Sequence, residues 1–193
     1  GLKIVRTDQE LQTPKVDQAL RDMGHDLVLL PDGISHPELI GHCVDADIIL
    51  MCYTPISEEL IAASQTLKGI VKYGVGIDAI AIDAAINRNI PVVNIPFYAE
   101  ETVAEGAFAM LMALFTRPPV LARPMPRAGW AWPEPHWLGR DIAEKTIGII
   151  GLGKIGRSFA RMAGPGFRAR VLAFDPNVPD TVMDPLGIEK LHA

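Results

Sequence analysis

The chain of 193 residues is 49% apolar and 21% charged. This composition is typical of a globular protein with one or two hydrophobic cores, and it excludes an intrinsically disordered chain. The net charge is −5, from 18 Lys and Arg against 23 Asp and Glu. Because a nucleic-acid-binding protein needs a basic face, we expect no nucleic acid as a partner. No apolar run reaches the roughly 18–20 residues of a membrane span, so we expect no membrane either.

Cys43 and Cys52 are the two cysteines of the sequence. Two cysteines at this spacing fit neither a disulfide framework nor a zinc site, so we expect no metal. A reducing, cytoplasmic location is the simplest prediction. Residues 1–6 (GLKIVR) favour a strand over a signal peptide.

Short β-branched runs alternate with helical stretches along the first half, which predicts an α/β protein with a largely parallel sheet. Ser57 and Asp78 are expected to be helix N-caps. The predicted strands are residues 2–6, 26–30, 47–52, 67–73 and 90–95, and the predicted helices are residues 14–23, 36–42 and 79–88.

The next stretch begins with a predicted helix over residues 102–116, which is apolar on almost every face and is therefore expected to be buried between layers. Residues 117–140 are too rich in proline for a helix or an inner strand. A second α/β unit begins at Thr146. We therefore predict one domain over residues 1–98 and a second over residues 99–193.

Residues 146–156 (TIGIIGLGKIG) predict a strand that leads into a phosphate-binding turn and a helix. Gly151 permits the tight turn, Gly153 lets a pyrophosphate approach the backbone, and Gly156 lets the helix pack closely on the strand. The N-terminus of the helix offers N–H groups and a partial positive charge to the phosphates. The alternative is a glycine turn that only reverses the chain.

A second strand, residues 169–174, ends at Asp175 and Pro176. The Asp175 carboxylate can accept hydrogen bonds from both ribose hydroxyls and repels a 2′-phosphate, which favours NAD over NADP. Lys154 and Ile155 lie on the turn and are also expected beside the cofactor.

Three stretches together resemble the D-isomer-specific 2-hydroxyacid dehydrogenases, most closely the D-3-phosphoglycerate dehydrogenase type. They are KYGVGIDAIAIDAAINRNIPVVNIP at residues 72–96, TVAE at residues 102–105, and LGRDIAEKTIGIIGLGKIGRSFARMA with VLAFDP at residues 138–163 and 171–176. The resemblance implies a flavodoxin-like substrate domain followed by an incomplete Rossmann NAD-binding domain. It also implies an NAD-dependent oxidoreductase that interconverts a D-2-hydroxy acid and its 2-oxo acid.

The resemblance further implies that the backbone N–H groups of Gly74, Val75 and Gly76 bind the substrate carboxylate, with Val75 also near the cofactor. A Gly-X-Gly turn at the end of a strand can bind an anion, although a plain strand-to-helix turn is the alternative. Lys72 lies next to this turn and could attract an acidic substrate. Thr102 matches a position near the nicotinamide, although it could also be an ordinary N-cap.

The family's catalytic arginine, glutamate and histidine all lie beyond the second Rossmann strand, so no residue here is assigned a catalytic role. His136, in the proline-rich segment, is not expected to replace that histidine. We expect the N-terminal portion of a dehydrogenase that forms a homodimer through its cofactor domain, with the particular 2-hydroxy acid left open. The alternative is a non-catalytic NAD(H)-binding or interaction module.

Overall fold

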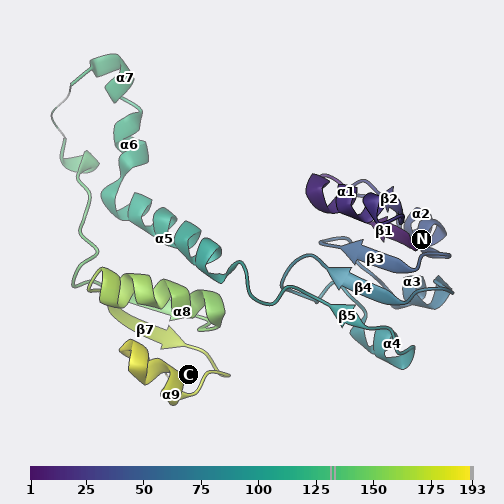
Figure 1. Ribbon diagram of the computed structural model, residues 1–193. Coiled ribbons are helices and arrows are strands. Elements are labelled where there is room, and N and C mark those ends of the chain that lie inside the picture. The colour runs from purple at the N-terminus through teal and green to yellow at the C-terminus, as the bar shows by residue number, and fades with distance from the viewer. Residues whose placement is uncertain (131, 133, 192–193) are drawn as a thin grey trace. The chain divides into compact units, whose positions relative to one another are not determined.

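A computed structural model describes residues 1–130, 132 and 134–191. The chain divides into two compact units, Gly1–Phe97 and Tyr98–Ala193. Each unit contains its own parallel sheet with helices connecting the strands (Figure 1). The α/β fold class predicted from the alternation of strands and helices is therefore confirmed.

The first unit is built on a five-stranded parallel sheet in the order β2-β1-β3-β4-β5. This is the flavodoxin-like order, in which ligands bind outside the carboxyl ends of the strands where the order reverses, here between β1 and β3. Its elements are β1 (Lys3–Arg6), α1 (Pro14–Asp22), β2 (Asp26–Leu29), α2 (His36–Cys43), β3 (Ile48–Met51), α3 (Glu58–Ala63), β4 (Gly69–Lys72), α4 (Ile82–Asn87) and β5 (Val92–Val93).

The core of the first unit lies between the sheet and helices α2, α3 and α4. Ile49 and Ile70, from the central strands, are fully buried with Leu39 of α2 and Leu60 of α3. The nearly continuous apolar sequence of β3 follows from this position, because a central parallel strand needs apolar side chains on both faces.

The ends of two helices in this unit test the expected N-caps. Ser57 caps α3, since its Oγ accepts a hydrogen bond from the Leu60 N–H at 3.1 Å, as predicted. The expected cap at Asp78 is wrong, because α4 begins only at Ile82. Asp78 instead lies in a turn, and Ile80 forms an isolated parallel bridge with Ile56 before α4 begins.

The second unit has a three-stranded parallel sheet in the order β6-β7-β8, the arrangement of one half of a Rossmann fold. The short strand β8 was not predicted. The elements are α5 (Glu100–Thr116), α6 (Pro118–Ala122), α7 (Met125–Ala128), η1 (Pro135–Trp137), β6 (Thr146–Ile150), α8 (Lys154–Arg161), η2 (Met162–Gly166), β7 (Arg170–Phe174), α9 (Asp180–Met183), η3 (Asp184–Leu186) and β8 (Ile188–Lys190).

Helix α5 packs on α8 along one side only. Phe108 is buried, and its ring lies 5.6 Å from that of Phe159. Met110 and Leu114 are 66% and 76% exposed, so the expectation that α5 is buried between layers is wrong for the described residues. None of the helices that the structure describes is long and apolar enough to cross a membrane.

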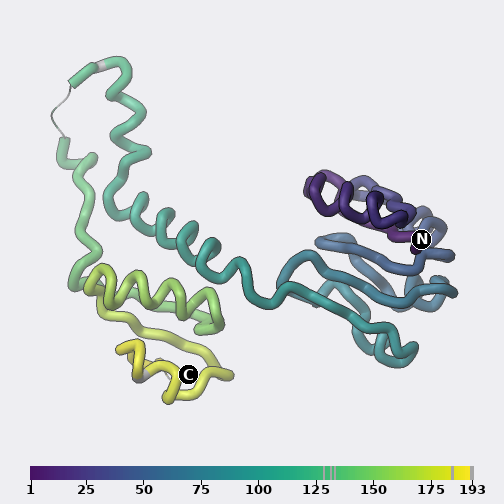
Figure 2. The backbone as a smooth tube through the Cα atoms, viewed as in Figure 1, coloured from purple at the N-terminus to yellow at the C-terminus, as the bar shows by residue number. Residues whose placement is uncertain are grey.

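The proline-rich segment after α5 contains two short helices and a 3-10 turn, α6, α7 and η1, so the prediction that it cannot be helical is wrong. Each of these elements has a proline in its first turn, where the missing N–H has no helical partner to lose. The segment then returns to the end of α5, where the Arg140 N–H donates to the Phe115 carbonyl oxygen at 2.7 Å. Figure 2 shows the backbone of α6 and α7 after the end of α5.

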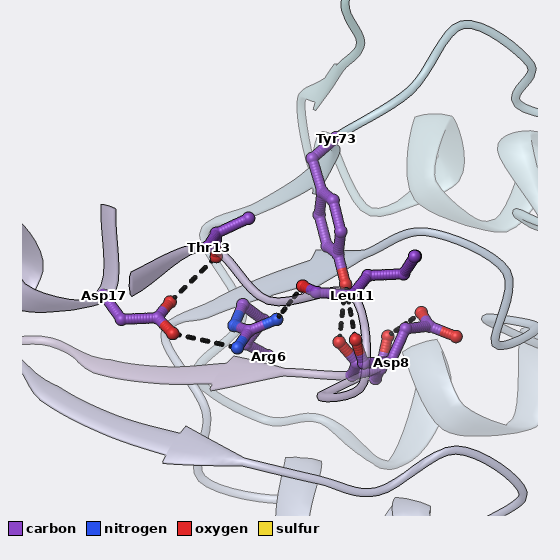
Figure 3. A network of polar contacts seen from close by, with 7 residues as sticks. Arg6, Asp8, Leu11, Thr13, Asp17 and Tyr73 are labelled. Atoms are coloured by element: carbon purple, nitrogen blue, oxygen red, sulfur yellow. Dashed lines mark hydrogen bonds and ion pairs between the residues drawn. The ribbon is translucent and has the colours of Figure 1, made fainter. Parts of the chain in front are cut away.

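A buried ion pair connects β1 to α1 in the first unit. Arg6 Nη2 lies 2.9 Å from Asp17 Oδ2, and both side chains are almost completely buried. Thr13 Oγ1 donates a further hydrogen bond to Asp17 Oδ1, and Arg6 Nη1 donates to the Leu11 carbonyl oxygen (Figure 3). The pair therefore holds the segment between β1 and α1 in place.

Replacing Asp17 with alanine should lower the free energy of unfolding of the first unit by about 3 kcal/mol, because it leaves a buried guanidinium without its partner charge. The matched control is Asp45→Ala, which removes an exposed carboxylate paired with Lys3 and should cost less than about 1 kcal/mol. Calorimetric unfolding measures both changes. Equal losses in the two variants would contradict this account of the Arg6–Asp17 pair.

Candidate functional site

The glycine turn of the second unit follows β6 without a gap. Gly151 has φ +91°, a conformation that side-chain-bearing residues rarely adopt. Its N–H donates to the carbonyl oxygen of Phe174, the last residue of β7, at 2.9 Å. Gly153 is the N-cap of α8, and because it has no side chain, no side-chain oxygen of its own competes with an anionic ligand for the N–H groups of that helix end.

Gly153 and Gly156 face different surroundings. A Cβ atom at Gly156 would overlap the Gly151 carbonyl oxygen. Helix α8 therefore lies so close to the turn that only glycine fits at this position. A Cβ atom at Gly153 would meet no atom within 4 Å. The space beside Gly153 is therefore open to a ligand, while the space beside Gly156 is filled by the protein itself.

Asp175 lies against the glycine turn. Its Oδ2 accepts the Leu152 N–H at 2.7 Å, and its Oδ1 accepts the Asn177 N–H at 2.8 Å. These two hydrogen bonds, from Asn177 and then from Leu152, lower the pKa of the carboxyl group. An ionised carboxylate has about four acceptor positions, so both oxygens keep capacity for further donors such as ribose hydroxyls.

The other predicted cofactor residues lie at three places in the second unit. Lys154 and Ile155 form the first turn of α8, and the Ile155 side chain is partly exposed. Pro176 is exposed directly after Asp175. Thr102 is exposed in the first turn of α5 and is not its N-cap, since the helix begins at Glu100 after Ala99. Contact of these residues with a cofactor stays a prediction.

In the first unit, Gly74, Val75 and Gly76 form a turn at the carboxyl end of β4. Two residues that follow β5 hold the turn, because the Ile95 N–H donates to the Gly74 carbonyl oxygen at 3.0 Å and Asn94 Nδ2 donates to the Val75 carbonyl oxygen at 2.7 Å. Among the described residues, no acceptor binds the three N–H groups of this turn. They are therefore available to an anionic ligand.

Lys72, the last residue of β4, packs against this turn, and its ammonium group contacts the loop after β3. The side chain is buried, and Nζ donates a hydrogen bond to the Cys52 carbonyl oxygen. Nζ also lies 5.2 Å from the centre of the Tyr53 ring, a cation–π distance. A Cβ atom at Gly74 would lie 2.7 Å from Lys72 Cε, so the lysine stem packs against the turn.

Asp8, which was not among the residues predicted from the sequence, binds the loop after β3 through its carboxylate. Oδ2 accepts the N–H groups of Cys52 and Tyr53 at 2.8 and 3.0 Å, and Oδ1 accepts the Thr54 N–H at 3.1 Å. One signal for this contact was present in the sequence. An aspartate directly after β1 and polar residues directly after β3 meet at the carboxyl edge of a flavodoxin-like sheet.

Within the described part of the chain, no group of three or more histidine, cysteine, aspartate or glutamate side chains could hold a metal ion. His136 is exposed and pairs with Glu134 at 3.2 Å. Its surroundings are those of an exposed surface residue.

A flavodoxin-like unit followed by a unit with a Rossmann-type glycine turn defines a class of two-unit α/β proteins. The family model described as D-isomer specific 2-hydroxyacid dehydrogenase, catalytic domain, matches residues 5–167. The chain therefore belongs to the D-isomer-specific 2-hydroxyacid dehydrogenase family, and the resemblance noted in its sequence is confirmed.

Similar proteins include D-3-phosphoglycerate dehydrogenase of Methanocaldococcus jannaschii, which is 30% identical over 158 residues, or 81% of this chain and 30% of that protein. Glyoxylate reductase of Korarchaeum cryptofilum is 36% identical over 154 residues, or 78% of this chain and 46% of that protein. The structure of D-lactate dehydrogenase from Aquifex aeolicus, complexed with NAD and lactic acid, has a TM-score of 0.79 and 27% identity, covering 97% of this chain and 55% of that chain. The chain thus spans 30% to 55% of the length of these three proteins.

Gly156 and Gly153 should differ in how much stability an added methyl group costs. Gly156→Ala should lower the free energy of unfolding of the second unit by about 1–3 kcal/mol, because the new methyl group meets a backbone carbonyl that cannot move away freely. Gly153→Ala should leave stability unchanged, because its methyl group enters open space. Calorimetric unfolding of both variants checks this. A large loss of stability in Gly153→Ala would show that the space beside Gly153 is not open.

Proposed function

We propose that this chain is part of an NAD-dependent oxidoreductase that interconverts a D-2-hydroxy acid and its 2-oxo acid. The observation that carries the proposal is the position of Asp175 against the glycine turn, 2.7 Å from the Leu152 nitrogen. The family membership supports the reaction class. The NAD complex of the Aquifex aeolicus D-lactate dehydrogenase supports the cofactor.

In this proposal the second unit binds the dinucleotide. The open space beside Gly153 and the N-terminus of α8 receive the pyrophosphate, and Asp175 uses its remaining acceptor positions for the two ribose hydroxyls. Lys154, Ile155 and Pro176 line the same site. When bound, NAD would supply the hydride acceptor for oxidation of the hydroxy acid at C2. Thr102 is proposed to lie near the nicotinamide.

The first unit is proposed to bind the substrate carboxylate through the N–H groups of residues 74–76. Those groups have no acceptor among the described residues, and Val75 is partly exposed beside them. Lys72 adds a positive charge below the turn, which favours an anion there. We assign no acid–base catalyst to the described residues, because the resemblance places that role beyond the second Rossmann strand.

The substrate class is a small D-2-hydroxy acid, and 3-phosphoglycerate is one candidate because several similar proteins are D-3-phosphoglycerate dehydrogenases. NADH consumption with a panel of 2-oxo acids, measured on protein that contains this chain, tests both reaction and substrate.

We place the protein in the cytoplasm because Cys43 and Cys52 are buried and unpaired, which suits a reducing compartment.

Asp175→Asn should weaken the preference for NAD over NADP. Removing the charge weakens the hydrogen bonds to the ribose and relieves repulsion of a 2′-phosphate, so the ratio of NAD to NADP affinity should fall on the order of tenfold. The hydrogen bonds from Asn177 and Leu152 hold the pKa of Asp175 below its ordinary value, so the carboxylate stays ionised at neutral pH, and NAD affinity should fall only as the pH drops through this lowered pKa.

Isothermal titration calorimetry with each dinucleotide measures this ratio. The control is Asp180→Asn, which neutralises another carboxylate of the second unit, paired with Lys190, and should leave the ratio unchanged. The cofactor proposal fails if the unsubstituted chain binds neither dinucleotide. It also fails if both variants alter the ratio equally.

We also propose that two copies of the chain associate through the second unit. Met110 and Leu114 are exposed on α5, and they line an apolar cavity of about 510 Å³. The other residues of this cavity are Ala113, Arg117, Pro119 and Val120. An exposed apolar patch of this kind marks an interaction site more often than a solvated surface.

Leu114→Glu should therefore convert a dimer into a monomer in analytical ultracentrifugation, because a carboxylate cannot be buried in an apolar interface without a partner. Met23→Glu is the matched control, since Met23 is similarly exposed on the first unit, at 70% against 76% for Leu114, and this variant should stay dimeric. A monomeric unsubstituted chain would rule out the proposed interface.

A further inference from the structure

Asp8 lies in an unusual environment, two residues after the end of β1. Its side chain is almost completely buried, although it carries a carboxylate. Its backbone has φ +56°, a left-handed conformation that is uncommon for residues other than glycine. Such strain is found most often at functional sites, where the surrounding structure stabilises it.

The carboxylate of Asp8 is surrounded by hydrogen-bond donors from the loop after β3. Besides the three N–H groups of residues 52–54, Thr54 Oγ1 donates at 2.9 Å and Thr7 Oγ1 at 2.6 Å. Burial raises the pKa of Asp8, but the hydrogen bonds from Thr7, Cys52 and Thr54 outweigh it, and the pKa is lowered. The contact is therefore fully formed at neutral pH and is lost only as the pH falls through this lowered pKa.

The loop after β3 is in turn connected to the turn after β4. The backbone of Cys52 is held on both sides of its Cα, because its N–H donates to Asp8 and its carbonyl oxygen accepts a hydrogen bond from Lys72 Nζ. Lys72 packs beneath Gly74. A continuous set of contacts therefore leads from Asp8 through Cys52 and Lys72 to the proposed carboxylate-binding turn.

A second connection joins the two loops directly. The Tyr73 hydroxyl donates to the Thr7 carbonyl oxygen at 2.6 Å and approaches the Asp8 carbonyl oxygen at 3.4 Å (Figure 3). Burial raises the pKa of Tyr73 to about 12, so the hydroxyl keeps its proton and remains a donor. Tyr73 immediately precedes Gly74, so this hydrogen bond fixes the start of the turn.

We propose that Asp8 is a positioning residue, which holds the Gly74–Gly76 turn ready to bind the carboxylate of the substrate. It acts through the Cys52 peptide and Lys72 rather than by touching the substrate. This inference rests on the proposed function, in which the N–H groups of the turn bind the substrate carboxylate.

Asp8→Asn tests the inference, with oxalate as a non-reacting analogue of a 2-oxo acid. An asparagine has one acceptor oxygen and turns an NH₂ group toward the N–H donors of residues 52–54. The loop after β3 should therefore lose hydrogen bonds and shift from its native position. The dissociation constant of oxalate should rise on the order of tenfold. Amide NMR signals of residues 74–76 report the binding, and thermal unfolding is measured in parallel.

Asp47→Asn is the matched control. Asp47 also binds a backbone N–H group, that of Lys3 at 2.8 Å, but at the opposite end of the sheet. It should lower stability while leaving oxalate affinity within about twofold of the unsubstituted chain. If Asp8→Asn lowers stability and leaves affinity unchanged, Asp8 is merely structural and the inference is wrong.

A milder pair of variants decides the question should Asp8→Asn fail to fold. Thr54→Val removes one donor to Asp8, whereas Thr54→Ser keeps the hydroxyl. Weaker oxalate binding in the valine variant, with recovery in the serine variant, supports the inference, and equal affinities overturn it. No oxalate binding by the unsubstituted chain would overturn the proposed carboxylate site as well, which separates that failure from a failure of Asp8 alone.

Discussion

The structure depends on one recurring interaction, in which an aspartate after one strand accepts backbone N–H groups from the loop that follows the neighbouring strand. Asp175, after β7, binds the loop after β6 in this way. Asp8, after β1, does the same for the loop after β3. Because the strands of each sheet are parallel, their carboxyl ends lie at one edge, and a single carboxylate can reach across to the adjacent loop.

The two aspartates serve different kinds of site. Asp175 is partly exposed and keeps acceptor positions for a ligand, and in the proposed function it both orders the glycine turn and binds the ribose. Asp8 is buried and receives five donor groups, so its acceptor capacity is used within the protein. The same interaction thus leaves acceptor capacity free for a ligand at Asp175, whereas at Asp8 that capacity is used within the protein.

The sequence predicted the glycine turn and Asp175 because the relevant residues form one local strand–turn–helix–strand pattern. The contact between Asp8 and Cys52, which are 44 positions apart, was missed because the aspartate after β1 and the polar residues after β3 can be recognised as partners only once the strand order is known. It was also wrong about α5, because an apolar helix sequence does not reveal which faces another element covers. The short helices at Pro118 and Pro135 were missed because proline excludes a helix interior but not its first turn.

The donors to both aspartates are mainly backbone N–H groups, and this has an evolutionary consequence. Every amino acid except proline supplies such a donor, so the side chains at Tyr53 and Asn177 are free to vary without loss of the hydrogen bond. Mutation can then reshape the surface of either loop while its backbone stays in register. Relatives with different specificities can arise on this framework without rebuilding it.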